Sequence, residues 1–319
     1  MFHTFTLKAL ACTTLFSLSL NATPLVTIAN YGPHASLEKT IQGFREELAI
    51  QGFEDGKTIQ IMESNVNFDQ ALIPQMLTKL QAQKPAVMLV MTTPVAEAAK
   101  HKIKTTPLVF ADITDPVAAG LIPSSDQANS NISGASEKQD LTALLAFAER
   151  LLPNAKRVGI LYATGEDNDK ALLKMMEEAT KAKDLELVAI GVDHARNVPM
   201  LMQKFKGKVD FIYVGTSGPI QPSLPAISSE AVRLHIPVIN ADSDAVKNNL
   251  VLASFGVSYE KIGQNAGKIA AQVLKGTEIS KISPLNPRPQ DHEGFISLKV
   301  LNDLKLELPK DLSQITVIK

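Results

Sequence analysis

Short apolar runs rich in β-branched residues alternate with longer amphipathic segments from Pro24 onward. The short runs are typical of buried strands, whereas the longer segments place apolar residues such as Ile41, Phe44 and Leu48 at helical spacing. In the first part of the chain we expect strands at 24–30, 57–64, 86–91 and 107–112, and helices at 34–51, 69–83 and 94–102. In the second part we expect strands at 157–163, 185–192, 209–215 and 236–242, and helices at 141–152, 168–183, 199–206 and 222–234.

Helices of this length between successive strands imply parallel sheets, because a parallel pair needs a long crossover, which is nearly always right-handed. We therefore predict an α/β fold with two doubly wound parallel-sheet lobes joined by a multi-strand hinge. Three segments are candidates for crossings between the lobes: a polar extended link at 129–136, a short strand at 250–258 and a proline-rich stretch at 282–294. Further helices are expected at 259–274 and 298–305.

The predicted hinge divides the chain discontinuously. The N-terminal lobe is expected to comprise 23–134 and 257–285, and the C-terminal lobe 135–256 and 286–319. A chain of 319 residues is long enough for each lobe to bury a core of its own.

The first 22 residues differ from the rest of the chain. A lysine near the start is followed by an uncharged, mostly apolar run at 9–20, and Ala22 offers a cleavage residue. This layout is typical of a secretory signal peptide, and the apolar run is too short for a transmembrane helix. A buried N-terminal helix is the other interpretation. We expect a signal peptide over 1–22 and a periplasmic product, which would lose the single cysteine, Cys12.

The composition favours a globular binding protein over several other classes. The chain is 45% hydrophobic and 20% charged with a net charge of −1, and no run of lysines or arginines suggests a nucleic acid partner. The histidines are scattered, and no glycine-rich dinucleotide motif follows a strand. We therefore expect no cofactor, no metal site and no catalytic residues, so an enzyme is the least favoured interpretation.

Polar residues follow six of the predicted strands. Because ligands of open parallel sheets bind outside the carboxyl ends of the strands, these segments are expected to border a cleft. They contain the candidate ligand-binding residues Tyr31, His34, Thr92, Thr93, Asp112, Asp115, Glu166, Asn168, Thr216, Ser217, Asp242 and Asp244.

Two of these segments allow more than one interpretation. In "TTPV", Thr92 or Thr93 could cap a helix whose free N–H groups and positive dipole end favour a carboxylate, but plain capping explains the threonines equally well. In "DITDP", a turn explains Asp115 better than ligand contact does, whereas both interpretations stay open for Asp112.

Other candidates also have structural alternatives. Glu166 suits the positive end of a helix dipole, and Asn168 is the better contact candidate because an amide both donates and accepts. Tyr31, Phe255 and Tyr259 could form an apolar wall, or could instead belong to the packing between the lobes.

Several quoted segments resemble one known family, in the order in which they occur. They include "TTPVAEAA", "TDPV" at 114–117, "NISG" at 131–134, "LLPNAKRVGILYATGEDND" and the "GxxYxxIG" pattern at 256–263. The chain resembles the ABC-transporter substrate-binding proteins of the tryptophan/tyrosine type from Leu25 to its C-terminus. This resemblance implies a type I periplasmic binding fold that holds a small ligand, often an aromatic amino acid, between two lobes.

The sequence departs from the family pattern at two places. Ala35 replaces the proline that follows His34, and Ser217 and Gly218 replace the Asp and Asn that commonly follow the eighth strand. The resemblance thus predicts that a carboxylate for a ligand ammonium is missing there, with Asp242 or Asp244 as its replacement.

These observations predict an exported, monomeric solute-binding protein that delivers a small ligand to an inner-membrane ABC permease. Closure of the two lobes around an amino acid with an apolar or aromatic side chain would be its mechanism. The alternative is a ligand-sensing subunit that docks on a membrane receptor and transports nothing.

Overall fold

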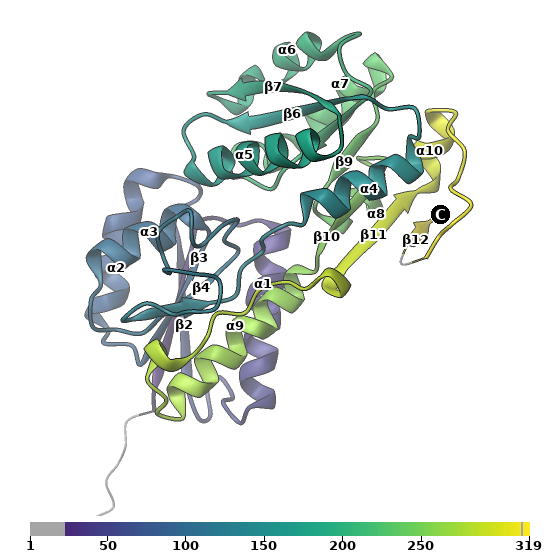
Figure 1. Ribbon diagram of the computed structural model, residues 1–319. Coiled ribbons are helices and arrows are strands. Elements are labelled where there is room, and N and C mark those ends of the chain that lie inside the picture. Colours follow the sequence, from purple (N-terminus) through teal and green to yellow (C-terminus); the bar gives the residue numbers. More distant parts are fainter. Residues whose placement is uncertain (1–22, 314) are drawn as a thin grey trace, which may run out of the picture.

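Two α/β lobes, one above the other in Figure 1, make up the protein. The computed structural model describes residues 23–313 and 315–319, so the predicted signal peptide lies outside the described residues. The predicted fold class is confirmed, because each lobe is a largely parallel sheet with helices on its faces. Within the described ranges, no helix is both long and apolar enough to cross a membrane.

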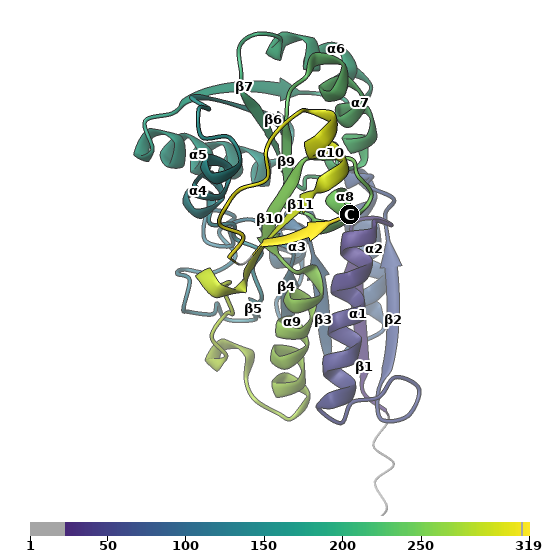
Figure 2. The same cartoon turned by 90° about the vertical axis from the view of Figure 1, so that its right-hand side faces the viewer.

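The N-terminal lobe contains a five-stranded parallel sheet in the order β2-β1-β3-β4-β5. Its strands are β1 (Leu25–Asn30), β2 (Gln60–Asn65), β3 (Val87–Met91), β4 (Leu108–Ala111) and β5 (Ile132–Gly134). Its helices are α1 (Ala35–Ile50), α2 (Ile73–Ala82), α3 (Thr93–Lys102) and α9 (Tyr259–Leu274). Although α9 is distant in sequence, it lies alongside α1 (Figure 2).

The C-terminal lobe contains a seven-stranded sheet in the order β12-β11-β10-β9-β8-β6-β7. Its strands are β6 (Arg157–Ala163), β7 (Glu186–Val192), β8 (Phe211–Val214), β9 (Val238–Asn240), β10 (Ala253–Val257), β11 (His292–Ser297) and β12 (Ile315–Ile318). Its helices are α4 (Leu141–Leu151), α5 (Asp167–Ala182), α6 (Val198–Met202), α7 (Leu224–Leu234), α8 (Ser243–Lys247) and α10 (Leu298–Asp303). The pairing of β10 with β11 is antiparallel, so this sheet is mixed near one edge.

Four short elements were not predicted, namely β5, α8, β11 and β12. The polar link expected at 129–136 contains β5, which pairs with β4 as an edge strand. Its Gly134 lies against β4, where an added Cβ would come 2.2 Å from the carbonyl oxygen of Phe110. In β5 and β11, glycine and polar residues interrupt the apolar residues, so no apolar run indicates a strand there, in contrast to the short strands β4 and β9.

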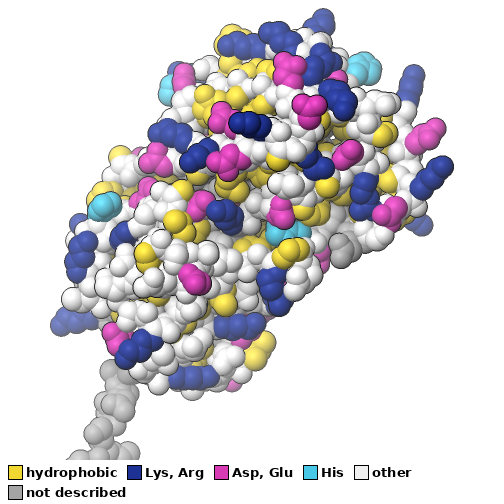
Figure 3. All heavy atoms as spheres, viewed as in Figure 1, with side chains coloured by type: hydrophobic (Ala, Val, Ile, Leu, Met, Phe, Trp, Pro, Cys, Tyr) yellow, Lys and Arg dark blue, Asp and Glu magenta, His cyan; other side chains and the backbone are white. Residues whose placement is uncertain are grey.

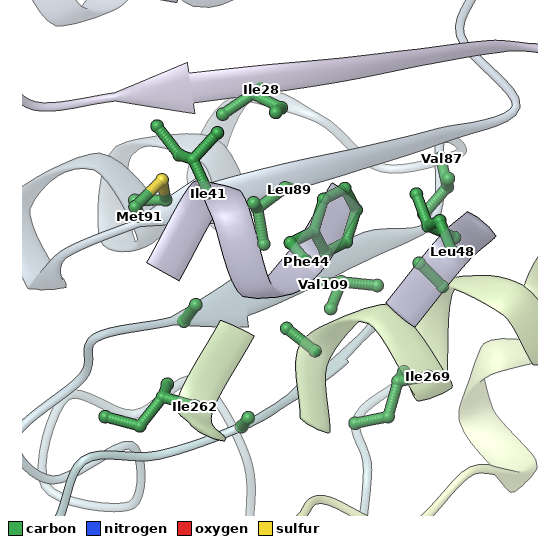
Figure 4. Close-up of a cluster of buried hydrophobic side chains, with 14 of the residues drawn as sticks. Ile28, Ile41, Phe44, Leu48, Val87, Leu89, Met91, Val109, Ile262 and Ile269 are labelled. Atoms are coloured by element: carbon green, nitrogen blue, oxygen red, sulfur yellow. The ribbon is translucent and has the colours of Figure 1, made fainter. Parts of the chain in front are cut away.

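The hydrophobic core of the N-terminal lobe lies between its sheet and the pair α1 and α9. Phe44 and Leu48 of α1 point toward Leu89 and Val109 of the sheet, and Ile269 of α9 joins them (Figure 4). The helical spacing on α1 and the continuous apolar runs of β3 and β4 therefore have a single explanation, since both faces meet in this core.

Glycines allow α1 and α9 to touch through their backbones. An added Cβ would lie 2.0 Å from the carbonyl oxygen of Thr40 at Gly263, and 2.2 Å from that of Glu260 at Gly43. No side chain fits at either position, which explains the last glycine of the "GxxYxxIG" pattern. The same contact places Tyr259, at the start of α9, beside Thr40.

Three segments connect the lobes and contact one another. An isolated bridge joins Ala135 to Leu285, and the Ser136 hydroxyl donates to the Asn286 side chain at 2.9 Å. The ring of His292 accepts a hydrogen bond from the Asp140 N–H at 3.2 Å and stacks on Phe255. The hinge is therefore a small packed unit rather than three independent linkers.

Replacing Gly263 with alanine is expected to force α1 and α9 apart. We predict a loss of about 3 kcal/mol in the free energy of unfolding, because the added methyl group meets rigid backbone. Urea denaturation followed by circular dichroism measures this loss. Gly165→Ala is the control, since no heavy atom lies within 4 Å of its added Cβ. Equal stability of the two variants would contradict the close-contact interpretation.

Candidate functional site

A cavity lies between the lobes, at the carboxyl ends of the strands, and its empty space, including the part open to solvent, is about 550 Å³. Nine of the twelve predicted site residues line it: Tyr31, His34, Thr92, Thr93, Asp112, Glu166, Asn168, Thr216 and Ser217. Its other lining residues are Ser36, Leu37, Phe68, Pro94, Thr114, Glu137, Gly218, Gln221, Pro222 and Tyr259. Both lobes thus contribute to one site, although whether each residue contacts a ligand stays a prediction.

Asp115 lies outside this cavity and serves the turn instead. Its carboxylate accepts hydrogen bonds from the N–H groups of Val117 and Ala118 at 3.1 and 3.0 Å. The other carboxylate oxygen pairs with the Lys138 ammonium at 2.7 Å. The turn interpretation therefore explains this residue, and its inclusion among the cavity residues is corrected.

Asp242 and Asp244 also lie outside the cavity. Asp242 caps α8, accepting the Asp244 N–H at 3.0 Å, and it accepts the Ser36 hydroxyl at 2.6 Å. Asp244 forms ion pairs with Lys39 of the other lobe and with Lys247. These carboxylates join the lobes directly, so the expectation that one of them replaces a missing ligand-binding carboxylate is not supported by their positions.

The N-terminus of α3 faces the cavity without a side-chain cap. Thr92 occupies the N-cap position, but its hydroxyl makes no capping hydrogen bond and is buried without a partner. Thr92 thus occupies the predicted N-cap position, but plain side-chain capping does not explain it. Within the described chain, the N–H groups of Thr93 and Val95 also meet no acceptor, and Pro94 has no N–H. These two N–H groups and the helix dipole favour an anion at this point.

The backbone of Thr92 is strained. Its φ of 70° and ψ of 154° lie in a region that is essentially restricted to glycine, and its β-branched side chain makes this conformation costly. The neighbouring strand end has a milder case, since Asp112 adopts a φ of 56°, which aspartate tolerates. Such strain concentrates at functional sites, and both of these residues line the cavity.

Asp112 and Glu137 are two buried acidic residues that line the cavity. Asp112 accepts the Thr40 hydroxyl at 2.8 Å, while its second oxygen is buried without a partner in the described chain. Burial, reinforced by repulsion from Glu137, raises the pKa of Asp112 well above its usual value. Burial also raises the pKa of Glu137 to about 7. Glu137 was not predicted from the sequence, because it follows the short strand β5, which was not predicted either.

The C-terminal lobe supplies a second acidic position at the N-terminus of α5. Glu166 occupies the N-cap position of this helix without a side-chain cap, and burial raises its pKa. Its carboxylate and the Tyr31 ring both lie against Gly218, where an added Cβ would meet them at 3.1 and 2.9 Å. Burial and the charge of Glu166 raise the pKa of Tyr31 to about 12. Gly218, which departs from the family pattern, thus lets Tyr31 approach the other lobe.

Aromatic and aliphatic side chains form one wall of the cavity. The rings of Tyr31 and Phe68 meet edge to face, with their centroids 5.5 Å apart, and Leu37 and Tyr259 also line the space. Phe255 does not belong to this wall, because it stacks between Phe147 and His292 at the hinge. The cavity therefore combines an apolar wall with polar positions on both lobes, as ligand sites commonly do.

His34 is neutral and serves as the N-cap of α1. Its Nδ1 accepts the Ser36 N–H at 3.2 Å, which leaves the proton on Nε2. Burial lowers the pKa of His34. Among the described residues, no group of three or more His, Cys, Asp or Glu side chains has the arrangement of a metal site.

Replacing Thr92 with glycine is expected to relieve the backbone strain. We predict that the free energy of unfolding rises by about 1 kcal/mol, since glycine adopts this conformation freely but loses more entropy on folding. Chemical denaturation measures the change. Thr92→Ser is the control, because it keeps the Cβ atom and should gain no stability. A glycine variant less stable than the wild type would show that the strain is not real.

Comparisons with known proteins identify the family. The family described as "ABC transporter substrate binding protein" matches residues 25–317. A tyrosine-binding protein of Clostridioides difficile (strain R20291) is 32% identical over 257 residues, which cover 81% of this chain and 74% of that protein.

Solved structures show the same fold. A conserved domain protein from Vibrio cholerae is 25% identical with a TM-score of 0.88, over 93% of this chain and all of that one. An ABC domain from Streptococcus pneumonia in complex with L-Trp is 23% identical with a TM-score of 0.87, over the same shares. The ligand-free, open structure of a substrate binding protein with adhesive properties from Clostridium difficile is 29% identical with a TM-score of 0.73, over 93% and 99% of the two chains.

The relatives are solute-binding proteins rather than enzymes, as the sequence predicts. Because the family match extends over nearly the whole described chain, the resemblance found in the sequence is confirmed. This chain belongs to the ABC transporter substrate-binding protein family.

Proposed function

We propose that this protein is the periplasmic binding component of an ABC importer and that it carries an amino acid with an aromatic or apolar side chain. Residues 1–22 direct export, and the mature monomer delivers its ligand to an inner-membrane permease. The rigid bodies that close on the ligand are 23–134 with 257–285, and 135–256 with 286–319. Binding of tyrosine by the relative that is 32% identical supports this ligand class.

The observation that carries the proposal is a set of buried polar atoms without partners in the described chain. They are Thr92 Oγ1 and Asp112 Oδ2 on one lobe, and Asn168 Oδ1 and Ser217 Oγ on the other. Leaving such atoms unsatisfied costs about 1–3 kcal/mol each, so a polar ligand that meets them gains that free energy. Since both lobes hold some of these atoms, a ligand that reaches all of them favours closure.

An amino acid zwitterion fits the chemistry of the cavity. Its carboxylate meets the N–H groups and hydroxyls at the start of α3, at Thr92 and Thr93. Its side chain lies against Tyr31, Phe68 and Leu37.

Direct contacts between the lobes are also consistent with closure. Lys39 of α1 pairs with Asp244, and Ser36 donates to Asp242. Charges of both signs are interspersed over the face shown in Figure 3, without a large region of one sign. We therefore assign recognition of the ligand to the cavity and not to electrostatic attraction by charged residues on the surface.

Aromatic amino acids are expected to raise the melting temperature of the mature protein. At a ligand concentration 100 times the Kd, binding to the folded form stabilises it by about 2.7 kcal/mol. A thermal-shift screen of L-tyrosine, L-tryptophan, L-phenylalanine and the other standard amino acids measures this effect. If no amino acid changes the melting temperature, the proposed ligand class is wrong.

The carboxylate position is tested with Thr93→Val, which removes a hydroxyl while keeping the side-chain shape. We expect an aromatic amino acid identified in the screen to bind about tenfold more weakly, because one hydrogen bond to a charged group is lost. Titration calorimetry measures the affinity. Thr78→Val is the matched control, since Thr78 lies on α2 and its hydroxyl donates to the Pro74 carbonyl outside the cavity. Equal affinity of the two variants for the ligand would contradict the assignment of the ligand carboxylate to Thr93.

A further inference from the structure

The cavity is acidic and has no internal counter-charge. Its lining includes the carboxyl groups of Asp112, Glu137 and Glu166, and among the described residues that line it there is no lysine or arginine. His34 is the one basic side chain of this lining, and its burial favours the neutral ring. A positive charge on the ligand is therefore the natural partner of these carboxyl groups.

Asp112 and Glu137 belong to one structural unit. The N–H of Glu137 donates to the carbonyl of Ile113 at 3.0 Å, which brings residue 137 beside the residue that follows Asp112. Thr114 donates to the Glu137 carboxylate at 3.4 Å, and Thr40 donates to Asp112 at 2.8 Å. Both residues are more than nine-tenths buried. Two carboxyl groups in such a site do not both ionise readily.

The surrounding groups do not neutralise the pair. Tyr259 of α9 and Tyr213 of β8 are buried phenols whose pKa values are raised, chiefly by burial, so they carry no charge near neutral pH. Asp242, which precedes α8, adds negative charge near Tyr259. Lys138 follows Glu137 directly, but its ammonium pairs with Asp115 outside the cavity. The pair therefore depends on a proton or on the ligand for its compensation.

The position of the pair matches the geometry of an α-amino acid. The Thr92 N–H donates to the Ala111 carbonyl at 3.0 Å, so the start of α3 and Asp112 are neighbours at the ends of adjacent strands. The ammonium and carboxylate groups of an amino acid share one carbon and must bind close together. Glu166 belongs to the other lobe and lies beside Tyr31 and Gly218, where the ligand side chain is expected.

We propose that Asp112 and Glu137 share one proton in the ligand-free protein and exchange it for the primary ammonium group of the ligand. This inference rests on the proposed function, because it concerns the same cavity. The proton leaves to solvent, and the ammonium N–H groups donate to Asp112 Oδ2 and to Glu137. No covalent bond changes apart from the O–H bond that is lost. The pair changes from one negative charge to two, and the ligand ammonium restores the net charge of the site.

This exchange makes binding depend on pH in a defined direction. Burial raises the pKa of Glu137 to about 7, and burial together with repulsion from Glu137 raises the pKa of Asp112 well above its usual value. Protons must leave the pair for the ammonium to bind, so affinity falls as the solution becomes more acidic. Affinity should rise by about tenfold or more per pH unit as the pH increases toward 7, and it should keep rising above pH 7 while Asp112 still holds a proton. The cavity should also select ligands with a free amine over analogues that lack one.

Titration calorimetry with L-tyrosine tests the exchange in the wild-type protein. At pH 6.5, titrations in two buffers of different ionisation enthalpy should reveal the release of about one proton per ligand bound. N-acetyl-L-tyrosine, which has no ammonium group, should bind at least about 100-fold more weakly. Tight binding of L-tyrosine without proton release would overturn the inference while leaving the proposed function intact. If L-tyrosine does not bind, the same titrations use the amino acid with the largest thermal shift.

Substitutions of the carboxyl groups test which of them hold the shared proton. Glu137→Gln and Asp112→Asn should each reduce the release at pH 6.5, because only one carboxyl group of the pair then remains to lose a proton. Glu166→Gln should retain the release. Asp115→Asn is the matched control for Asp112→Asn, since Asp115 lies on the same turn but outside the cavity, and it should keep both affinity and release. Loss of the release in Glu166→Gln but not in Glu137→Gln would overturn the assignment.

Discussion

The contact between α1 and α9 is the constraint on which the rest of the structure depends. The chain builds most of the N-terminal lobe, crosses to build the C-terminal lobe, and then returns so that α9 can cover the first sheet. Gly43 and Gly263 allow the two helices to approach through their backbones. Because α9 begins at the hinge, docking it on α1 fixes where the crossings lie. It also brings Tyr259, which lines the cavity, beside Thr40.

The cavity is built at a cost to the stability of the fold. Thr92 adopts a backbone conformation suited to glycine, and polar atoms on both lobes are buried without partners in the described chain. Two acidic side chains that line the cavity, Asp112 and Glu137, are buried. Each of these features opposes folding, and each becomes favourable when a molecule with complementary charges and donors occupies the space. One ligand can therefore compensate the strain, the unpaired polar atoms and the buried acidic groups of the site together.

Closure depends on two kinds of contact. One kind joins the lobes directly, as between Lys39 and Asp244 and between Ser36 and Asp242, at the edge of the cavity. The other kind would pass through the ligand, from Thr92 and Asp112 to Asn168 and Ser217. Because partly exposed ion pairs contribute little, the Lys39–Asp244 pair guides the orientation of the lobes more than it holds them shut, whereas the hydrogen bond between Ser36 and Asp242 is buried. The packed hinge, in which His292 bridges two of the crossing segments, limits the directions in which the lobes can move.

The fold class, most of the strands and helices, and the strand ends that border the site could all be predicted from the sequence. This was possible because helical and strand periodicity are local, and because parallel sheets bring their carboxyl ends together. Only the tertiary structure decided which polar residues reach the cavity. Asp112 and Asp115 stand three positions apart in one turn, yet only the first lines the site. Glu137 could not be assigned to the cavity from the sequence, because it follows β5, an edge strand that pairs with β4 and has no run of apolar residues. Asp242 and Asp244 were engaged by side chains of α1, which lie about 200 positions away in the chain. Such pairings depend on how the two lobes meet, and no local pattern encodes that.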